Sequence, residues 1–193
     1  MSSETSTSLL DRVRERRDDA AWGTLVEIYT PLIRGWLRRH AQLDDDADDI
    51  IQDVLAVVVR RIPEFQREPR VGAFRAWMRM ITINCFRDAW KARRRVQPAA
   101  DSRIAEFLQQ LADPTSGLSH IWDQEHDRFV TQQLLNLIRG EFSEKTWSAF
   151  ERFALADEPA ETVATELGMT VNAVFIAKSR VLSALRREGA GLL

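Results

Sequence analysis

The sequence has a single cysteine, Cys85, among its 193 residues. An intrachain disulfide and a cysteine metal cluster are therefore both excluded. Proline and glycine are scarce, with 6 and 8 residues respectively, and runs rich in β-branched residues are few. Because helix-forming residues dominate the remainder, we predict an all-α protein.

Long hydrophobic runs and a signal peptide are also missing from the sequence. No apolar run approaches the roughly 18 residues that a membrane span requires. The chain starts with the polar stretch MSSETSTS, whereas a secretory signal shows an apolar stretch after a basic start. We therefore expect a cytoplasmic protein.

The sequence offers little that would build an active site. The 3 histidines, His40, His120 and His126, have no metal-like arrangement with Cys85. There is no Gly-rich phosphate loop and no pattern of converging carboxylates. We therefore expect neither catalysis nor a metal or other cofactor.

Charge is segregated along the chain, although the formal net charge is only −2. Residues 70–95 contain eight cations and one acid, Asp88, whereas residues 98–142 contain seven acids and three cations. Such asymmetry indicates a local nucleic-acid patch rather than a general attraction to polyanions.

The basic stretch from Val71 to Arg95 has the pattern of one helix. Its apolar residues recur at three- and four-residue steps, which places them on one face: Phe74, Trp77, Met78, Ile81, Cys85 and Ala89. The cations lie off this face: Arg75, Arg79, Arg87, Lys91, Arg93, Arg94 and Arg95. Phe86 and Trp90, one turn apart, lie among the cations.

This combination suits single-stranded or melting nucleic acid, because cations neutralise phosphate and aromatic rings stack on unpaired bases. The alternative is a core helix with a solvated basic face, in which a neighbouring helix covers Phe86 and Trp90. The stretch by itself leaves both interpretations open.

Three helices are expected before the basic stretch, over residues 9–17, 19–40 and about 45–62, with Pro31 kinking or dividing the second. The third begins in an acidic run, and negative charge favours a helix N-terminus. Asp49, Gln52 and Asp53 share its outer face. This face is either simply solvated or docks a basic partner.

The segment 98–119 reads as an interdomain linker, because it contains Pro98, Pro114 and Gly117 among small residues. One short helix is possible within it, over residues 104–111. Helical periodicity resumes at His120, and Ser143 is expected to cap a later helix.

The segment 158–189 has the form of a helix-turn-helix. Pro159 suits the start of the first helix, Gly168 its end, and Thr170 the cap of the second. Apolar residues hold the second helix against the first: Val171, Val174, Val181 and Leu185. The side chains left for a DNA major groove are Asn172, Phe175, Ile176, Lys178, Ser179 and Arg180. A plain helical hairpin is the alternative, and the turn chemistry favours the DNA-reading form.

Two patches together resemble the extracytoplasmic-function sigma factors, the small two-domain members of the sigma-70 family of bacterial RNA polymerase subunits. The stretches DADDIIQDVLAVVVRRIPEF and AFRAWMRMITINCFRDAWKARRR are similar to region 2 of that family. The stretch PAETVATELGMTVNAVFIAKSRVLSALRRE is similar to its region 4. The order and spacing of both patches is more specific than either alone.

The resemblance implies a region 2 helical bundle at 1–97, a flexible linker at 98–119 and a region 4 helix-turn-helix domain at 120–193. It also implies that the partners are promoter DNA and core RNA polymerase, through the β and β′ subunits. An anti-sigma factor or another regulator stays open as a partner. The expected location is the cytoplasm, with nucleoid association in the holoenzyme.

The resemblance also implies residue roles. Asp49, Gln52 and Asp53 fit the surface for the β′ coiled coil. The loop from Gln66 to Ala73 and the basic helix fit the reader of the minus-ten motif, with Asn84 near a flipped-out base. The expected minus-ten set is Arg70, Arg75, Arg79, Asn84, Phe86, Arg87, Trp90, Lys91 and Arg94. The second helix of region 4, with the six side chains named above, is expected to read the minus-thirty-five motif.

The sequence departs from the family at Phe175, where many relatives carry Lys or Arg, and at Lys178, where an aliphatic residue is more usual. Phe175 and Ile176 could instead contact thymine methyl groups. One rival is a helical enzyme or scaffold, for which the sequence lacks an active-site pattern. The other is a helix-turn-helix repressor or activator that acts without core polymerase. It has no obvious dimer helix here and no use for aromatic rings beside a basic run.

Overall fold

The computed structural model describes residues 8–15, 18–41, 47–65, 71–96 and 102–193. Every regular element within these ranges is helical, which confirms the all-α prediction. The chain divides into two compact units. We call Leu9–Val130 with Gly191–Leu193 the N-terminal unit, and Thr131–Ala190 the C-terminal unit.

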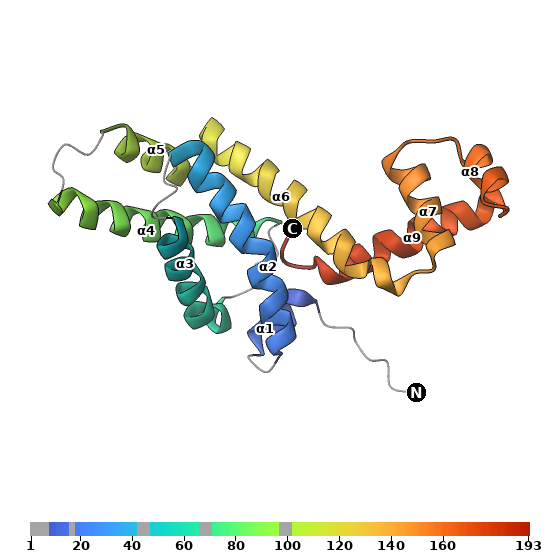
Figure 1. Cartoon of the computed structure of the whole chain (residues 1–193), viewed down its shortest axis with the longest axis horizontal. Helices are drawn as coiled ribbons and strands as arrows, with labels where there is room; N and C mark the ends of the chain where they lie inside the picture. The colour runs from blue at the N-terminus through green and yellow to red at the C-terminus, as the bar shows by residue number, and fades with distance from the viewer. Residues whose placement is uncertain (1–7, 16–17, 42–46, 66–70, 97–101) are drawn as a thin grey trace. The chain divides into compact units, whose positions relative to one another are not determined.

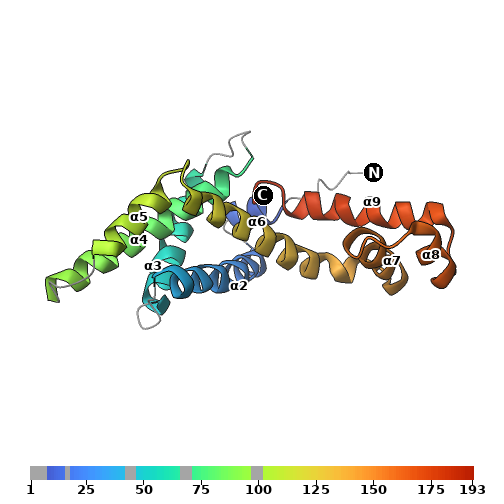
Figure 2. The same cartoon turned by 90° about the horizontal axis from the view of Figure 1, so that it is seen from above.

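Among the described residues, the N-terminal unit contains six α-helices, the last of which continues into the C-terminal unit. They are α1 (Leu9–Arg14), α2 (Asp19–Trp36), α3 (Ala47–Arg61), α4 (Ala73–Val96), α5 (Ser102–Ala112) and the first part of α6 (Gly117–Ile138). A π-helical segment, Leu37–Ala41, extends α2, and a 3-10 turn, Ile62–Glu64, follows α3. Helix α3 packs on α2 and α4, and α5 lies beside α4 in both views (Figures 1 and 2).

Helix α2 begins where Asp18 accepts a hydrogen bond of 2.8 Å from the backbone amide of Ala21, which satisfies one orphan donor of the first turn. Pro31 lies inside α2 and does not divide it. The buried face of α2 consists of Ala21, Leu25, Ile28, Tyr29, Leu32, Ile33 and Trp36. Each large apolar side chain buried in this way contributes roughly 1.5–3 kcal/mol to folding.

The segment expected to be a linker contains α5 and the start of α6. Leu108 and Leu111 of α5 are buried, and so is Trp122 of α6. The Trp122 ring lies 4.9 Å from the ring of Trp36 in α2. The segment therefore packs into the N-terminal unit, because its apolar residues are spaced to cover α2 and α4. Pro114 lies in the turn between α5 and α6, and Gly117 is the first residue of α6. Pro98 is outside the described residues.

The C-terminal unit contains the end of α6 and three further α-helices. They are α7 (Glu144–Phe150), α8 (Ala160–Glu166) and α9 (Val171–Glu188), with a 3-10 turn at Arg139–Glu141 and a π-helical segment at Glu151–Leu155. Ser143 caps α7, as expected, and accepts a hydrogen bond from the amide of Thr146 at 3.3 Å.

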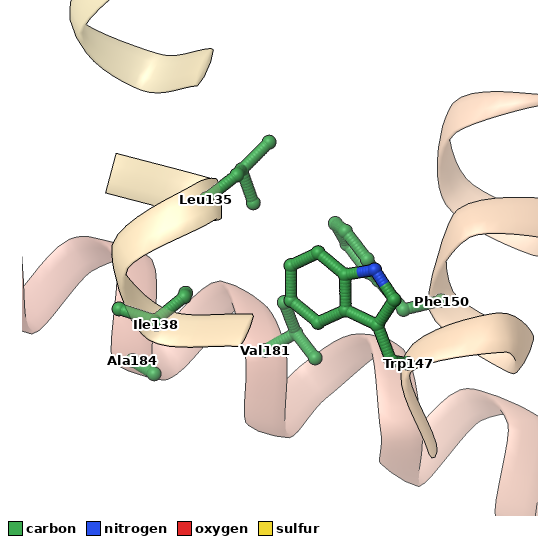
Figure 3. Close-up of a cluster of buried hydrophobic side chains, with 6 residues drawn as sticks. All are labelled: Leu135, Ile138, Trp147, Phe150, Val181 and Ala184. Carbon is green, nitrogen blue, oxygen red and sulfur yellow. The ribbon is translucent and has the colours of Figure 1, made fainter. Parts of the chain in front are cut away.

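Two apolar clusters hold the C-terminal unit together. The first joins α6, α7 and α9 around the ring of Trp147 (Figure 3), through Leu135, Ile138, Trp147, Phe150, Val181 and Ala184. The second joins α7, α8 and α9 through Ala149, Ala160, Val163, Ala164, Val174 and Ala177. Because Val174, Ala177, Val181 and Ala184 recur at three- and four-residue steps, α9 keeps its opposite face in solvent.

Candidate nucleic-acid and protein interfaces

The first candidate surface is the outer face of α3. Asp49, Gln52 and Asp53 are all exposed, and they lie together because their spacing is three and four residues. The opposite face of α3 is buried, through Ala47, Ile50, Ile51, Val54 and Val58. The structure thus brings the three predicted polymerase-binding residues into one acidic patch.

The charge of Asp53 also reaches the neighbouring helix α4. Burial, with the nearby carboxylates of Asp53 and Asp88, raises the pKa of the Cys85 thiol to about 11. Cys85 is therefore a protonated core residue at neutral pH, in agreement with its position on the apolar face of α4.

The second candidate surface is the solvent-facing side of α4. Asn84 and Lys91 are exposed and Arg87 is half-buried. The Arg87 guanidinium lies 3.5 Å from the Asn84 side-chain oxygen, and the Lys91 ammonium lies 4.0 Å from Asp88. Three predicted minus-ten residues therefore share one accessible strip, which we call the α4 strip: Asn84, Arg87 and Lys91.

Two other predicted minus-ten residues are bound by acids of α6. Arg79 is 4 % exposed and donates to Asp123 at 2.7 Å and to the Ser119 carbonyl at 3.3 Å. Arg75 pairs with Asp127 and lies 3.7 Å from Asp123. Such counter-charges are what a buried guanidinium requires, because an unpaired buried charge is strongly destabilising.

The aromatic members of the predicted minus-ten set lie differently from the α4 strip. Phe86 is 2 % exposed, and its ring packs against Phe107 of α5 with centroids 6.2 Å apart. Trp90 is half-buried. Phe86 is therefore covered by a neighbouring helix, as the alternative interpretation of the basic stretch expects. Helix α4 is buried on more than one face because α3 and α5 both pack on it.

Arg70 lies outside the described residues. Arg94 lies in α4, but its side chain is also outside them.

A buried histidine in α6 joins this network and was not predicted from the sequence. Nε2 of His126 lies 2.9 Å from the Tyr29 hydroxyl, and Nδ1 lies 3.1 Å from Asp127. Burial lowers the pKa of His126 below its ordinary value and raises that of Tyr29. Burial also acts to raise the pKa of Asp127, but hydrogen bonds from His126 and Arg75 hold it below its usual value. The only sequence signal was the polar interruption of the apolar pattern around His126.

The third candidate surface is the helix-turn-helix formed by α8 and α9. Gly168 has φ +58° in the turn, a conformation that glycine adopts without strain, and its carbonyl accepts from Lys145 at 2.8 Å. Thr170 caps α9 by accepting from the amide of Ala173 at 3.1 Å. The predicted turn chemistry is therefore confirmed.

The exposed face of α9 carries five of the six predicted reading residues: Asn172, Phe175, Ile176, Ser179 and Arg180. The sixth, Lys178, is half-buried, and its ammonium lies 5.0 Å from the ring centroid of Phe153. Such a position over an aromatic face is favourable for a cation.

Two further findings concern metals and membranes. Within the ranges that the structure describes, no group of three or more His, Cys, Asp or Glu side chains is arranged to hold a metal ion. No helix among the described residues has the length and apolar character to cross a bilayer.

Comparison with known proteins gives one match to a family model over part of the chain and one match to a relative over nearly all of it. Residues 25–96, which span most of α2 and all of α3 and α4, match the family model of sigma-70 region 2. Over 180 residues the chain is 24% identical to the ECF RNA polymerase sigma factor RpoE of Cereibacter sphaeroides, an alignment that covers 93% of this chain and 91% of the relative. Both similarities agree with the resemblance to the extracytoplasmic-function sigma factors that the sequence shows.

Proposed function

We propose that this chain is an RNA polymerase sigma factor of the extracytoplasmic-function type. It binds core RNA polymerase and directs promoter recognition, DNA melting and the start of transcription. One observation carries the proposal: a sigma-70 region 2 match at residues 25–96 is followed in the same chain by a capped helix-turn-helix at α8–α9. The chemistry of RNA synthesis belongs to the polymerase, and this chain supplies binding alone, in the cytoplasm and on the nucleoid.

The acidic patch of α3 is the proposed contact with the β′ subunit. Its three side chains are exposed, while the other face of the helix is used for packing. The patch can therefore engage a basic partner without unfolding the bundle.

The α4 strip is the proposed contact with the melted minus-ten motif. The Asn84 amide can hydrogen-bond an unpaired base, and Arg87 and Lys91 can hold the phosphates beside it. Melting is then driven by binding to the unpaired strand, because capture of a flipped base offsets the cost of leaving the stack.

Arg75, Arg79 and Phe86 belong to the same proposed site but are engaged inside the N-terminal unit. The carboxylates of Asp123 and Asp127 occupy the guanidinium groups that would otherwise meet phosphate. For these three residues to contact DNA, α5 and the first part of α6 must leave α4. The protein without polymerase is therefore expected to bind promoter DNA weakly.

The exposed face of α9 is the proposed reader of the minus-thirty-five motif. A recognition helix presents such a face to the major groove. The rival function, a repressor or activator that works alone, is not favoured by a match to a polymerase subunit family.

The test is retention of the protein by purified core polymerase, followed by transcription from a promoter that core alone does not use. We expect retention and promoter-specific initiation. A chain that ignores core polymerase yet footprints duplex DNA specifically would be a repressor or activator instead.

A further inference from the structure

Two large apolar side chains near the start of α9 lie on its exposed face, and we call them the apolar tip. Phe175 and Ile176 are 49% and 48% exposed, and they are neighbours on the solvent face of α9. The buried face is served by other residues, such as Val174 and Ala177. Large apolar side chains at this exposure are available for contact with a partner.

The Phe175 ring is nevertheless held in place. It meets the ring of Phe153 edge-on, with centroids 5.2 Å apart and an interplanar angle of 83°. Phe153 lies in the π-helical segment Glu151–Leu155 and packs on the apolar cluster between α7, α8 and α9. The Lys178 ammonium lies over the same Phe153 ring. Phe153 thus connects the exposed ring to the core of the C-terminal unit.

We infer that Phe175 and Ile176 recognise thymine methyl groups in the minus-thirty-five motif, and that Phe153 is the residue that positions Phe175. The inference rests on the proposed function, since it names the bases that α9 would read. The thymine methyl is the one apolar group that a base pair presents in the major groove. A rigid apolar tip therefore distinguishes thymine from every other base edge.

The surroundings of the tip favour duplex DNA over an apolar protein partner. Asn172 lies one turn before Phe175 and is exposed, and an amide can pair with adenine through two hydrogen bonds. Arg180 is exposed one turn after Ile176, within reach of phosphate. Cations and an amide around an apolar centre match a groove edge rich in thymine and adenine.

The experiment uses reconstituted holoenzyme and a promoter selected with it. Each thymidine of the minus-thirty-five motif is replaced singly by deoxyuridine, which removes only the methyl group. We expect one or two positions at which the substitution weakens binding about fourfold, the effect of removing one buried methyl-sized group. Phe175→Ala and Ile176→Ala should each remove the distinction between thymine and uracil at one position.

Phe153→Leu tests the positioning role, because leucine keeps apolar packing in the cluster but removes the edge-on ring contact. It should reduce the loss of affinity that deoxyuridine causes at the position read by Phe175. The effect of other base changes on affinity should stay as in the native protein. Leu155→Ala is the matched control, since Leu155 is apolar and 59% exposed but lies outside α9. It should leave the uracil effect unchanged.

Specific outcomes would overturn the inference. One is equal binding of thymine and uracil promoters by the native holoenzyme, and another is a uracil effect that survives both alanine substitutions. Self-association of the native protein that Phe175→Ala abolishes, without any uracil effect, would show that the tip binds a second copy. Failure to form a holoenzyme would instead contradict the proposed function, and this outcome is scored separately by retention on core polymerase.

Discussion

The Tyr29 hydroxyl of α2 lies 2.9 Å from Nε2 of His126 in α6, although the two residues are 97 positions apart in the sequence. The contact is buried, and Asp127 approaches the other ring nitrogen. It therefore holds the first part of α6 in the N-terminal unit, next to the ion pairs of Asp123 and Asp127 with Arg75 and Arg79 of α4. The hydrogen bond between Tyr29 and His126 forms with a neutral imidazole, since burial disfavours the charged form of the ring.

Stability should fall as the pH falls below about 6.5. The folded-state pKa of His126 lies below its ordinary value because the ring is buried, so the unfolded chain takes up a proton that the folded unit does not. The resulting slope is at most about 1.4 kcal/mol per pH unit. His126→Gln, which keeps a hydrogen-bonding group near Tyr29, should flatten the profile of unfolding free energy between about pH 7 and 5.

The other titratable groups that face His126 affect stability in different pH ranges from the histidine. Asp127, whose pKa is depressed, destabilises only when the pH falls below the ordinary range of a carboxyl group, and Tyr29, whose pKa is raised, only at alkaline pH. Asp123 and Arg75 influence the ring through their charge. A native profile that stays flat through pH 6 in chemical denaturation would contradict the assignment.

Neutralising Asp123 and Asp127 of α6 should free Arg75 and Arg79 of α4 for contact with DNA. In the double variant Asp123→Asn, Asp127→Asn, Arg75 and Arg79 lose their counter-charges but keep hydrogen-bonding partners. We expect the protein without polymerase to bind single-stranded minus-ten DNA more tightly. The log–log salt slope should steepen by about 0.7 for each arginine that gains a phosphate. Fluorescence anisotropy at several salt concentrations measures both effects.

Glu125→Gln is the matched control for this variant. Glu125 lies on α6 between the two aspartates and pairs with Arg39 at 2.6 Å rather than with α4. It changes the net charge by one without releasing either arginine. The double variant changes the net charge by two, so a gain in the control of half that in the double variant or more would mean that net charge, not the release of the arginines, controls the affinity.

Reversing the α3 patch should weaken the holoenzyme. Asp49→Lys with Asp53→Lys replaces two exposed acids, and exposed charges contribute only about 0–1 kcal/mol to stability. We therefore expect weaker binding to core polymerase with only a small fall in melting temperature, because Asp49 lies in the first turn of α3 and a negative charge there favours the helix by roughly 0.3–1 kcal/mol. The control is Glu161→Lys, an exposed acid of α8. Native affinity of the double variant at low salt would remove α3 from the interface.

Local chemistry explains which parts of the fold could be predicted from the sequence. Thr170 and Gly168 define the start of α9 and the end of α8 through contacts within a few residues, so the local sequence could predict their roles. The burial of Arg79 depends on Asp123, which lies 44 residues away. No pattern in the basic stretch could reveal that partner.

The same reasoning applies to the segment between the two expected domains. Pro98, Pro114 and Gly117 suggested a tether, but the Phe107 ring of α5 packs against Trp36 of α2 and Phe86 of α4. Such helix-to-helix packing depends on tertiary arrangement, whereas proline and glycine report only on the local backbone.

Asn84 and Lys91 both lie on the α4 strip, but their substitution by alanine should have different effects on promoter binding and melting. Asn84→Ala removes an amide that we expect to meet an unpaired base, so it should change the preferred minus-ten base and slow open-complex formation. Closed-complex binding to duplex DNA should persist, because that step depends on α9 and on phosphate contacts. Permanganate reactivity of unpaired thymines, on duplex and pre-melted promoters, measures the melting step.

Lys91→Ala is the matched comparison, because the Lys91 side chain is 62% exposed and its ammonium lies 4.0 Å from the exposed carboxylate of Asp88. It should weaken binding for all sequences alike and reduce the log–log salt slope by roughly 0.7–0.9, as expected for one lost phosphate contact. Base preference should not change. If Asn84→Ala melts promoters normally with native base preference, while Lys91→Ala behaves as expected, α4 contacts the DNA backbone and another element reads the bases.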